Sequence, residues 1–344
     1  MSRLEERYRR VLRLLPAAYR QEWEDEMVAA FLESMTTGDP ETDEYLADYG
    51  RPSLPEVASV LSLAARLRLG GVGAPPRAYA WGQAVRLATL MGVLANAVMA
   101  TAGISIMLWL AGRIPGLPAP EATLTVPAQS WHTTWQLASY AWLPAYLALV
   151  LGHRRVAQAV ALIAVVPPVI TAVIEAVGAS PLSVTTWAMR ITDIVLLLAM
   201  STFRHDSPAV PRRPWLLAVP VGILLVPVPL FVVQTSTPAL HLLDWPGLAC
   251  LVVTAAIAVH LAVRGVGRSP GAAPWSLAFS LLATATLIVR VATLLDYRNQ
   301  VQHVALATLG SIEAVAVVAV GVPVAVLAAR RLRQLPPAST VSAG

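Results

Sequence analysis

Long apolar stretches, separated by short polar or charged loops, fill the chain from about residue 87 onward. Eight of them are 17–25 residues long, enough for each to cross about 30 Å of hydrocarbon as a helix. They cover residues 87–111, 135–151, 156–178, 185–203, 215–233, 246–263, 275–295 and 305–329. This pattern predicts an all-α fold, a polytopic membrane helix bundle of about eight spans within residues 77–334.

The residues before the first span show helical periodicity in shorter segments. In the first segment four apolar residues share one helix face before Pro16 interrupts the pattern; they are Leu4, Tyr8, Val11 and Leu15. Two further helices are predicted, over about 17–35 and 55–69. Together they predict a small N-terminal cytoplasmic domain of three helices, which with its linker covers residues 1–76.

The segments between and after these helices are polar. Residues 36–53 contain several Gly and Pro residues and predict a loop, and residues 70–76 predict a linker. Residues 335–344 predict a disordered cytoplasmic tail.

The second helix places five apolar side chains on one face, namely Tyr19, Trp23, Met27, Ala30 and Phe31.

Arginine positions give the orientation of the spans. Ten lie in alternate loops and at the C-terminal end: Arg154, Arg155, Arg204, Arg212, Arg213, Arg264, Arg268, Arg330, Arg331 and Arg333. The other loops hold only Arg113 and Arg298. Because positive residues favour the cytoplasmic side, the pattern predicts a multi-pass protein of the cell membrane with both termini in the cytoplasm.

Tryptophan positions agree with the predicted spans. Five Trp residues fall at span ends, where their rings suit the headgroup level: Trp109, Trp187, Trp215, Trp245 and Trp275.

The composition narrows the function classes. Of the 344 residues, 56% are hydrophobic and 13% charged, whereas soluble domains have about 45–50% apolar and about 25% charged residues. All basic residues are Arg and none is Lys, so the lysine-dependent sites of P-loop NTPases, kinases and Schiff-base enzymes are excluded in their usual form. Residues 1–85 hold 10 Arg and 13 acidic residues. The positive excess therefore lies in the membrane part, and we expect no direct binding to nucleic acid.

Motifs for enzymatic chemistry are missing from the sequence. The six His residues lie in different segments without metal-ligand spacing, and no nucleophile elbow occurs. The single Cys250 allows no intrachain disulfide. We therefore expect neither a cofactor nor a metal site, and a protein that is not an enzyme.

Five ionisable residues inside predicted spans are the candidate site residues, because a charge at mid-bilayer costs about 2.5–3.5 kcal/mol or more. They are Glu175, Arg190, Asp193, Arg290 and Glu313. With the orientation above, all five fall in the outer half of the bilayer. Arg190 and Asp193 are three residues apart on one helix and can pair. Arg290 and Glu313 lie at compatible depths on consecutive antiparallel spans and can form an interhelical pair.

Two interpretations of these charges remain open. They could line an outward-facing polar pocket that senses or passes a small ligand or ion. Alternatively, they could form two structural ion pairs that fix helix packing, with Glu175 reaching the membrane surface.

The basic face of the first helix also has two interpretations. Arg3, Arg7 and Arg10, flanked by Arg9 and Arg13, lie opposite its apolar face. This face could lie on anionic lipid, or it could be a solvated face paired with the acidic second helix.

Residues 7–16 (RYRRVLRLLP), 19–20 (YR), 23–27 (WEDEM) and 31–33 (FLE) carry a resemblance to a known family. They resemble the N-terminal helical domain of actinobacterial integral membrane proteins, which is similar to the helix-turn-helix-associated alpha-helical signalling domain and to the prefix domain of some permeases. The resemblance implies signalling through a cytoplasmic partner, often a PadR-type transcription regulator. Within these segments the candidate partner-binding residues are Arg7, Arg10, Trp23, Glu26 and Phe31.

Two functions follow as expectations. In the first, the bundle senses an envelope or ligand state, and the N-terminal domain binds a cytoplasmic transcription regulator or sigma factor. In the second, the protein is a transporter or permease component whose N-terminal domain docks an ATPase subunit or acts as a gate. In both cases the lipid bilayer surrounds the spans.

Overall fold

The computed structural model describes residues 2–36, 38–68, 70, 76–110, 112–114, 137–178, 183–203, 210–226, 228, 244–264, 272–298 and 304–335. Within these ranges the chain is helical and contains no strand, as the apolar pattern predicts. It divides into two compact units. One comprises Met1–Gln83 together with Arg331–Gly344, and the other comprises Ala84–Arg330. The predicted tail from residue 336 lies outside the described residues.

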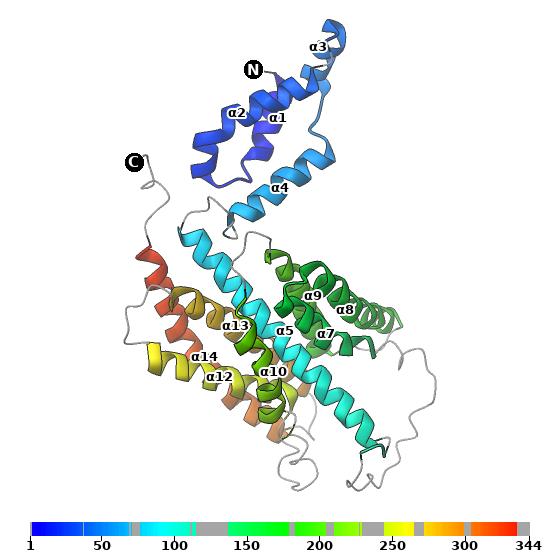
Figure 1. The fold of residues 1–344 in the computed structure, drawn as a ribbon, viewed down its shortest axis with the longest axis vertical. Coiled ribbons are helices and arrows are strands. Elements are labelled where there is room, and N and C mark those ends of the chain that lie inside the picture. The colour runs from blue at the N-terminus through cyan, green and yellow to red at the C-terminus, as the bar shows by residue number, and fades with distance from the viewer. Residues whose placement is uncertain are drawn as a thin grey trace. The chain divides into compact units, whose positions relative to one another are not determined.

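Four helices form most of the first unit (Figure 1): α1 (Arg3–Leu12), α2 (Ala17–Met35), α3 (Pro40–Tyr49) and α4 (Leu54–Arg68). Of the predicted apolar face, Leu4 and Tyr8 are buried on α1, Leu15 is buried just after it and Val11 is partly buried, and Leu12 joins them with no exposed surface. Phe31 of α2 stacks on Tyr8 of α1, with ring centroids 4.0 Å apart and planes 11° from parallel. Val60, Ala64 and Leu67 of α4 complete the core, so this unit has a hydrophobic core of its own.

The prediction of a loop over residues 36–53 is wrong, because α3 lies within it. Asp39 occupies the N-cap position, Pro40 begins the helix, and its first turn is acidic, all of which are helix-start signals. No residue of α3 is buried. The Gly and Pro residues that predict a loop lie before α3, begin it, end it or follow it, so they mark its boundaries and do not interrupt it.

Arg9, which flanks the predicted basic face of α1, pairs with α2. Arg9 lies 3.3 Å from Glu24 and 2.9 Å from Asp25, both on α2, and 3.1 Å from Glu5 on its own helix. These hydrogen-bonded acidic side chains raise the pKa of Arg9 above its already high ordinary value. These contacts support the pairing with the acidic second helix for Arg9, whereas Arg7 donates to the carbonyl of Gly50 and Arg10 pairs with Glu6 on α1 itself.

The second unit holds the apolar helices (Figure 1): α5 (Pro76–Leu110, entering from the first unit), η1 (Leu137–Ala141), α7 (Trp142–Leu151), α8 (Arg154–Val177), α9 (Val184–Ala199), η2 (Met200–Thr202), α10 (Arg212–Leu225), α12 (Trp245–Arg264), α13 (Ala272–Tyr297) and α14 (Val304–Arg333). Six of these segments are long and apolar enough to cross a membrane: α5, α8, α9 with η2, α12, α13 and α14. The five Trp residues predicted to mark span ends all lie in the first or last turn of a helix.

The second and fifth predicted spans correspond to shorter helices. Residues 135–151 contain η1 and α7, which together cover 15 residues, Leu137–Leu151. Residues 215–233 contain α10, and residues 227 and 229–233 lie outside the described part of the chain. Among the described residues, six of the eight predicted spans are therefore helices long and apolar enough to cross a membrane.

The helices α7 and α8 pack against each other across a tight turn. Gly152, in the left-handed region with φ +94°, ends α7 and turns the chain directly into α8. On α7, Tyr146 is fully buried and donates a hydrogen bond to the carbonyl of Trp215 at 2.7 Å. The predicted second span is thus a buried core helix of the unit.

The long helix α5 contacts α9 and also the core formed by α12, α13 and α14 (Figure 1). Asn96 of α5 reaches Asp193 of α9, and a Cβ on Gly92 would lie 2.6 Å from Leu196 of the same helix. Met91 packs against the core formed by α12, α13 and α14. The order of the α9 contacts along α5 shows that these two helices run antiparallel.

Candidate functional site

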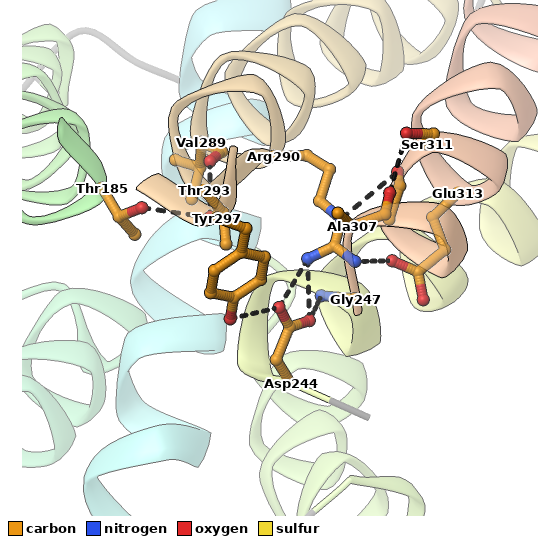
Figure 2. A network of polar contacts seen from close by, with 11 residues as sticks. Thr185, Asp244, Gly247, Val289, Arg290, Thr293, Tyr297, Ala307, Ser311 and Glu313 are labelled. Carbon is orange, nitrogen blue, oxygen red and sulfur yellow. Dashed lines mark hydrogen bonds and ion pairs between the residues drawn. The ribbon is translucent and has the colours of Figure 1, made fainter. Parts of the chain in front are cut away.

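Arg290, on α13, is the largest fully buried side chain of the described residues. Its guanidinium lies between two carboxylates from the neighbouring helices, as Figure 2 shows. Nη1 donates to both oxygens of Asp244, at 2.8 Å to Oδ1 and 2.6 Å to Oδ2. Nη2 lies 2.6 Å from Oε2 of Glu313 on α14, an ion pair whose angles fall outside hydrogen-bond geometry. The arrangement joins α12, α13 and α14 through a single cation.

Asp244 precedes the first residue of α12 and caps that helix. Its Oδ1 accepts a hydrogen bond from the backbone N–H of Gly247 at 2.8 Å, and its carbonyl accepts one from Leu248. The hydroxyl of Tyr297 donates to Oδ2 at 3.1 Å. This carboxylate therefore accepts hydrogen bonds from Tyr297 of α13, from the N-terminus of α12 and from Arg290.

Two glycines allow the charged groups to come this close. A Cβ on Gly247 would lie 2.7 Å from Oε1 of Glu313 and 2.8 Å from Oδ1 of Asp244. A Cβ on Gly310 would lie 2.6 Å from Cζ of Arg290. Real Cβ atoms essentially never approach that closely, so a side chain at either position would displace the charged groups.

The last turns of α13 contact two helix starts. Tyr297 binds Asp244 beside α12, while the preceding residue, Asp296, accepts hydrogen bonds from the backbone N–H groups of Val184 and Thr185 at 2.8 and 2.9 Å. Thr185 also donates to Thr293 at 3.2 Å. The C-terminal end of α13 thus supplies an N-cap to α9 from another helix.

A second, smaller cluster lies between α9 and α5. Arg190 donates to Oδ2 of Asp193 at 2.9 Å, and Asn96 of α5 donates to Oδ1 at 3.2 Å. The Asp193 side chain is nearly buried, with 13% of its surface exposed. Arg190 balances the negative charge of Asp193, and Asn96 supplies a further hydrogen-bond donor.

Both predicted ion pairs are therefore confirmed, within α9 and between α13 and α14. Glu175 belongs to neither cluster; it is exposed near the C-terminal end of α8. Among the described residues no three His, Cys, Asp or Glu side chains converge in a way that could hold a metal ion. The arrangement can hold helices together and can exchange a proton at a carboxylate.

Sequence reasoning missed Asp244, Asn96, Asp296 and Tyr297. Asp244 directly precedes a Trp–Pro pair that begins a span, which is an N-cap signal. Asp296 and Tyr297 follow the predicted end of the seventh span at residue 295, but α13 continues through both. Tyr297 lies seven residues after Arg290, on the same helix face. A neutral Asn in an apolar run carries no comparable signal.

The five candidate partner-binding residues of the first unit divide into two groups. Phe31 is in the core, and Arg7 donates to the carbonyl of Gly50 at 2.5 Å, so both have structural contacts inside the unit. Arg10, Trp23 and Glu26 lie on the surface. Trp23 retains 41% of its surface exposed although it stacks on Tyr19.

Comparison with known proteins adds no relative, since no family model, no curated protein and no solved structure matches the chain.

Proposed function

We propose that this protein is a multi-pass signalling or regulatory protein of the cell membrane whose N-terminal helical unit binds a cytoplasmic partner. One observation carries the proposal: the first unit is compact, has its own hydrophobic core, and leaves Arg10, Trp23 and Glu26 on its surface. A separate folded unit attached to apolar spans suits recognition of a soluble protein.

The proposed topology has eight spans, and helix ends support it. Consecutive residues of α13, Asp296 and Tyr297, contact the start of α9 and the residue preceding α12. Helices α9 and α12 therefore begin at the same end of the unit. The chain between them must return across the unit once, and α10 is the helix available for that crossing.

The positions of helix ends also support a crossing by η1 and α7. Because α5 runs antiparallel to α9, α5 ends where α9 begins. A Cβ on Gly103 of α5 would lie 2.7 Å from the ring of Tyr140 in η1, so η1 also starts near that end. Only six residues connect α8 to α9, so α8 ends at the same end of the unit. Because α8 then starts at the opposite end, α7 has to carry the chain across the unit to the start of α8.

The arginine-rich ends gather at the opposite end of the unit. Gln158, near the start of α8, donates to the carbonyl of Met200 at the end of α9. Arg212 at the start of α10 donates to the carbonyl of Leu151 at the end of α7. Since positive residues favour the cytoplasm, this gathering supports cytoplasmic termini.

A transporter or permease component is the second candidate. The observation in its favour is the Asp244–Arg290–Glu313 network, because polar networks inside a membrane bundle also occur along substrate paths. The partner would then be an ATPase subunit. In the first candidate, the partner is a transcription regulator or sigma factor that the N-terminal unit sequesters or releases.

Site-specific crosslinking in the native host tests the proposal. A photoreactive amino acid replaces Trp23 in the full-length protein, and crosslinked proteins are identified by mass spectrometry. We then expect the purified partner to bind the full-length protein in nanodiscs, with an affinity that Trp23→Ala and Glu26→Arg each reduce about tenfold or more, as a loss of at least about 1.4 kcal/mol requires.

The matched control is Tyr45→Ala on α3, another exposed aromatic residue, at 64% exposure. It should leave the affinity unchanged. Crosslinking to an ATPase subunit, or equal binding by the Trp23→Ala protein, would contradict the signalling function and favour transport.

A further inference from the structure

We infer that the buried Asp244–Arg290–Glu313 cluster is a proton-binding site at which Glu313 holds the proton. The inference is independent of the proposed partner of the N-terminal unit, because it concerns only α12, α13 and α14.

The charge count of the cluster carries the first step. With all three side chains ionised, one cation faces two anions, and the cluster has a net charge of −1. Arg290 is fully buried and Glu313 is 5% exposed. Burying an uncompensated charge costs several kcal/mol, about as much as breaking a buried ion pair, and a bound proton removes it.

The second observation is that the two carboxylates lie close to the same point. Both come within 2.8 Å of the point that a Cβ on Gly247 would occupy, so the two groups face each other across that glycine. Two carboxylates in one buried place do not both ionise readily, because each disfavours the charge of the other.

The unequal number of donors assigns the proton. Asp244 accepts hydrogen bonds from Arg290, from the Tyr297 hydroxyl and from the backbone N–H of Gly247. Glu313 has the Nη2 ion pair with Arg290, and its Oε2 has no partner with hydrogen-bond geometry. A proton adds a hydrogen-bond donor where few donors are present, so Glu313 is the carboxyl that holds it.

The groups around Glu313 identify the ligand. On α13 it faces Arg290, and beside the start of α12 it faces Asp244, while the buried thiol of Cys250 on α12 interacts with it electrostatically. Two carboxylates beside a guanidinium offer too few anionic oxygens for a cation such as Ca²⁺, which takes 6–8 oxygen ligands. A proton needs only one of them.

The chemical step is an acid dissociation. The O–H bond of the Glu313 carboxyl breaks, its electron pair remains on the carboxylate, and the proton passes to water. Arg290 then faces two full negative charges in place of one. Release and uptake of this proton therefore change the electrostatic attraction among α12, α13 and α14 without altering any other residue.

Infrared spectroscopy of the full-length protein in nanodiscs tests this inference. A protonated carboxyl gives a carbonyl stretch separate from that of a carboxylate, and the stretch shifts in deuterated water. We expect wild type to show this band at neutral pH and to lose it at alkaline pH. Glu313→Gln should lack the band. Asp244→Asn should also lose it at neutral pH, because Glu313 then pairs alone with Arg290 and ionises.

Glu175→Gln serves as the matched control, since it removes an exposed carboxyl of the same unit and should leave the band unchanged. The inference is overturned if wild type shows no protonated-carboxyl band at neutral pH, or if Glu313→Gln retains it. Should Glu313→Gln fail to fold, Glu313→Asp provides the assignment by shifting the band's frequency, and an unshifted band would count against Glu313.

Discussion

Nη1 of Arg290 and Oδ2 of Asp244 lie 2.6 Å apart, an ion pair that joins α13 to the residue preceding α12. The same guanidinium pairs with Glu313 on α14. Arg290 is thus the one side chain through which all three helices make a charged contact in this cluster (Figure 2).

Replacing Arg290 with Met should destabilise the second unit strongly. Removing one partner of a buried ion pair costs about 3–5 kcal/mol, and here two neighbouring carboxylates would be left. Thermal unfolding in detergent, followed by tryptophan fluorescence, measures the effect. The triple variant Arg290→Met, Asp244→Asn, Glu313→Gln should be more stable than Arg290→Met alone. An equal stability of the two proteins would mean that the carboxylates carry no penalty.

Adding a methyl group at Gly310 should also weaken this unit. The Cβ of Gly310→Ala would meet the Arg290 guanidinium, and overpacking a tight site typically costs about 1–3 kcal/mol. Gly178→Ala is the matched control, because its Cβ would meet only backbone oxygens, at 3.5 and 3.6 Å. The midpoint of thermal unfolding should fall for the first variant and not for the second. Equal midpoints would show that the guanidinium can move aside.

Removing the cap that Asp296 provides should loosen the start of α9. Asp296→Asn weakens the acceptor for Val184 and Thr185, and loss of an N-cap costs about 0.5–2 kcal/mol. Hydrogen exchange should become faster at the first turn of α9 while the middle of α13 is unchanged. Ser183→Ala, which removes the local acceptor of the Thr186 N–H, provides a comparison at the same helix start.

In the first unit, Phe31 and Trp23 should behave differently. Phe31→Ala removes a buried ring stacked on Tyr8 and should cost about 3–5 kcal/mol. Trp23→Ala changes a largely surface position and should have a much smaller effect. Limited proteolysis of the full-length protein measures the rate at which this unit opens. Similar rates for both variants would contradict the assignment of Phe31 to the core.

The alkaline stability of the first unit should depend on Tyr8. Burial raises the pKa of the Tyr8 phenol, and the nearby Glu56 carboxylate raises this pKa further. The neutral phenol is therefore favoured in the folded state. Its contribution to stability is complete below the unfolded pKa of about 10 and is lost as the pH rises through the folded pKa. Proteolysis should accelerate at alkaline pH in wild type and less so in Tyr8→Phe.

The membrane helices were predictable because their signal is long. For α8, α9, α12, α13 and α14, the predicted starts lie within three residues of those observed. The apolar residues that define each span are the same residues that the helix buries in the unit or exposes to lipid. The pairing of Arg290 with Glu313 followed from their depths on consecutive helices.

The rest depended on contacts that a periodic pattern does not encode. Asp244 lies outside any predicted span, and its partner is 46 residues away along the chain. The helix α3 buries no residue, and the Gly and Pro residues that predict a loop lie at its boundaries. Phe31 and Trp23 lie on one predicted face of the second helix, yet the neighbouring helices cover Phe31 and leave Trp23 exposed. Such selection among residues of one face is decided by tertiary packing.

The adjacency of Asp296 and Tyr297 has a mechanical consequence. One peptide unit of α13 is attached to the beginnings of two other helices, α9 and α12. A rotation of this last helical turn would strain the hydrogen bonds at both helix starts, since the two side chains leave the backbone at neighbouring positions. The last turn of α13 therefore couples the starts of α9 and α12 through the side chains of two consecutive residues.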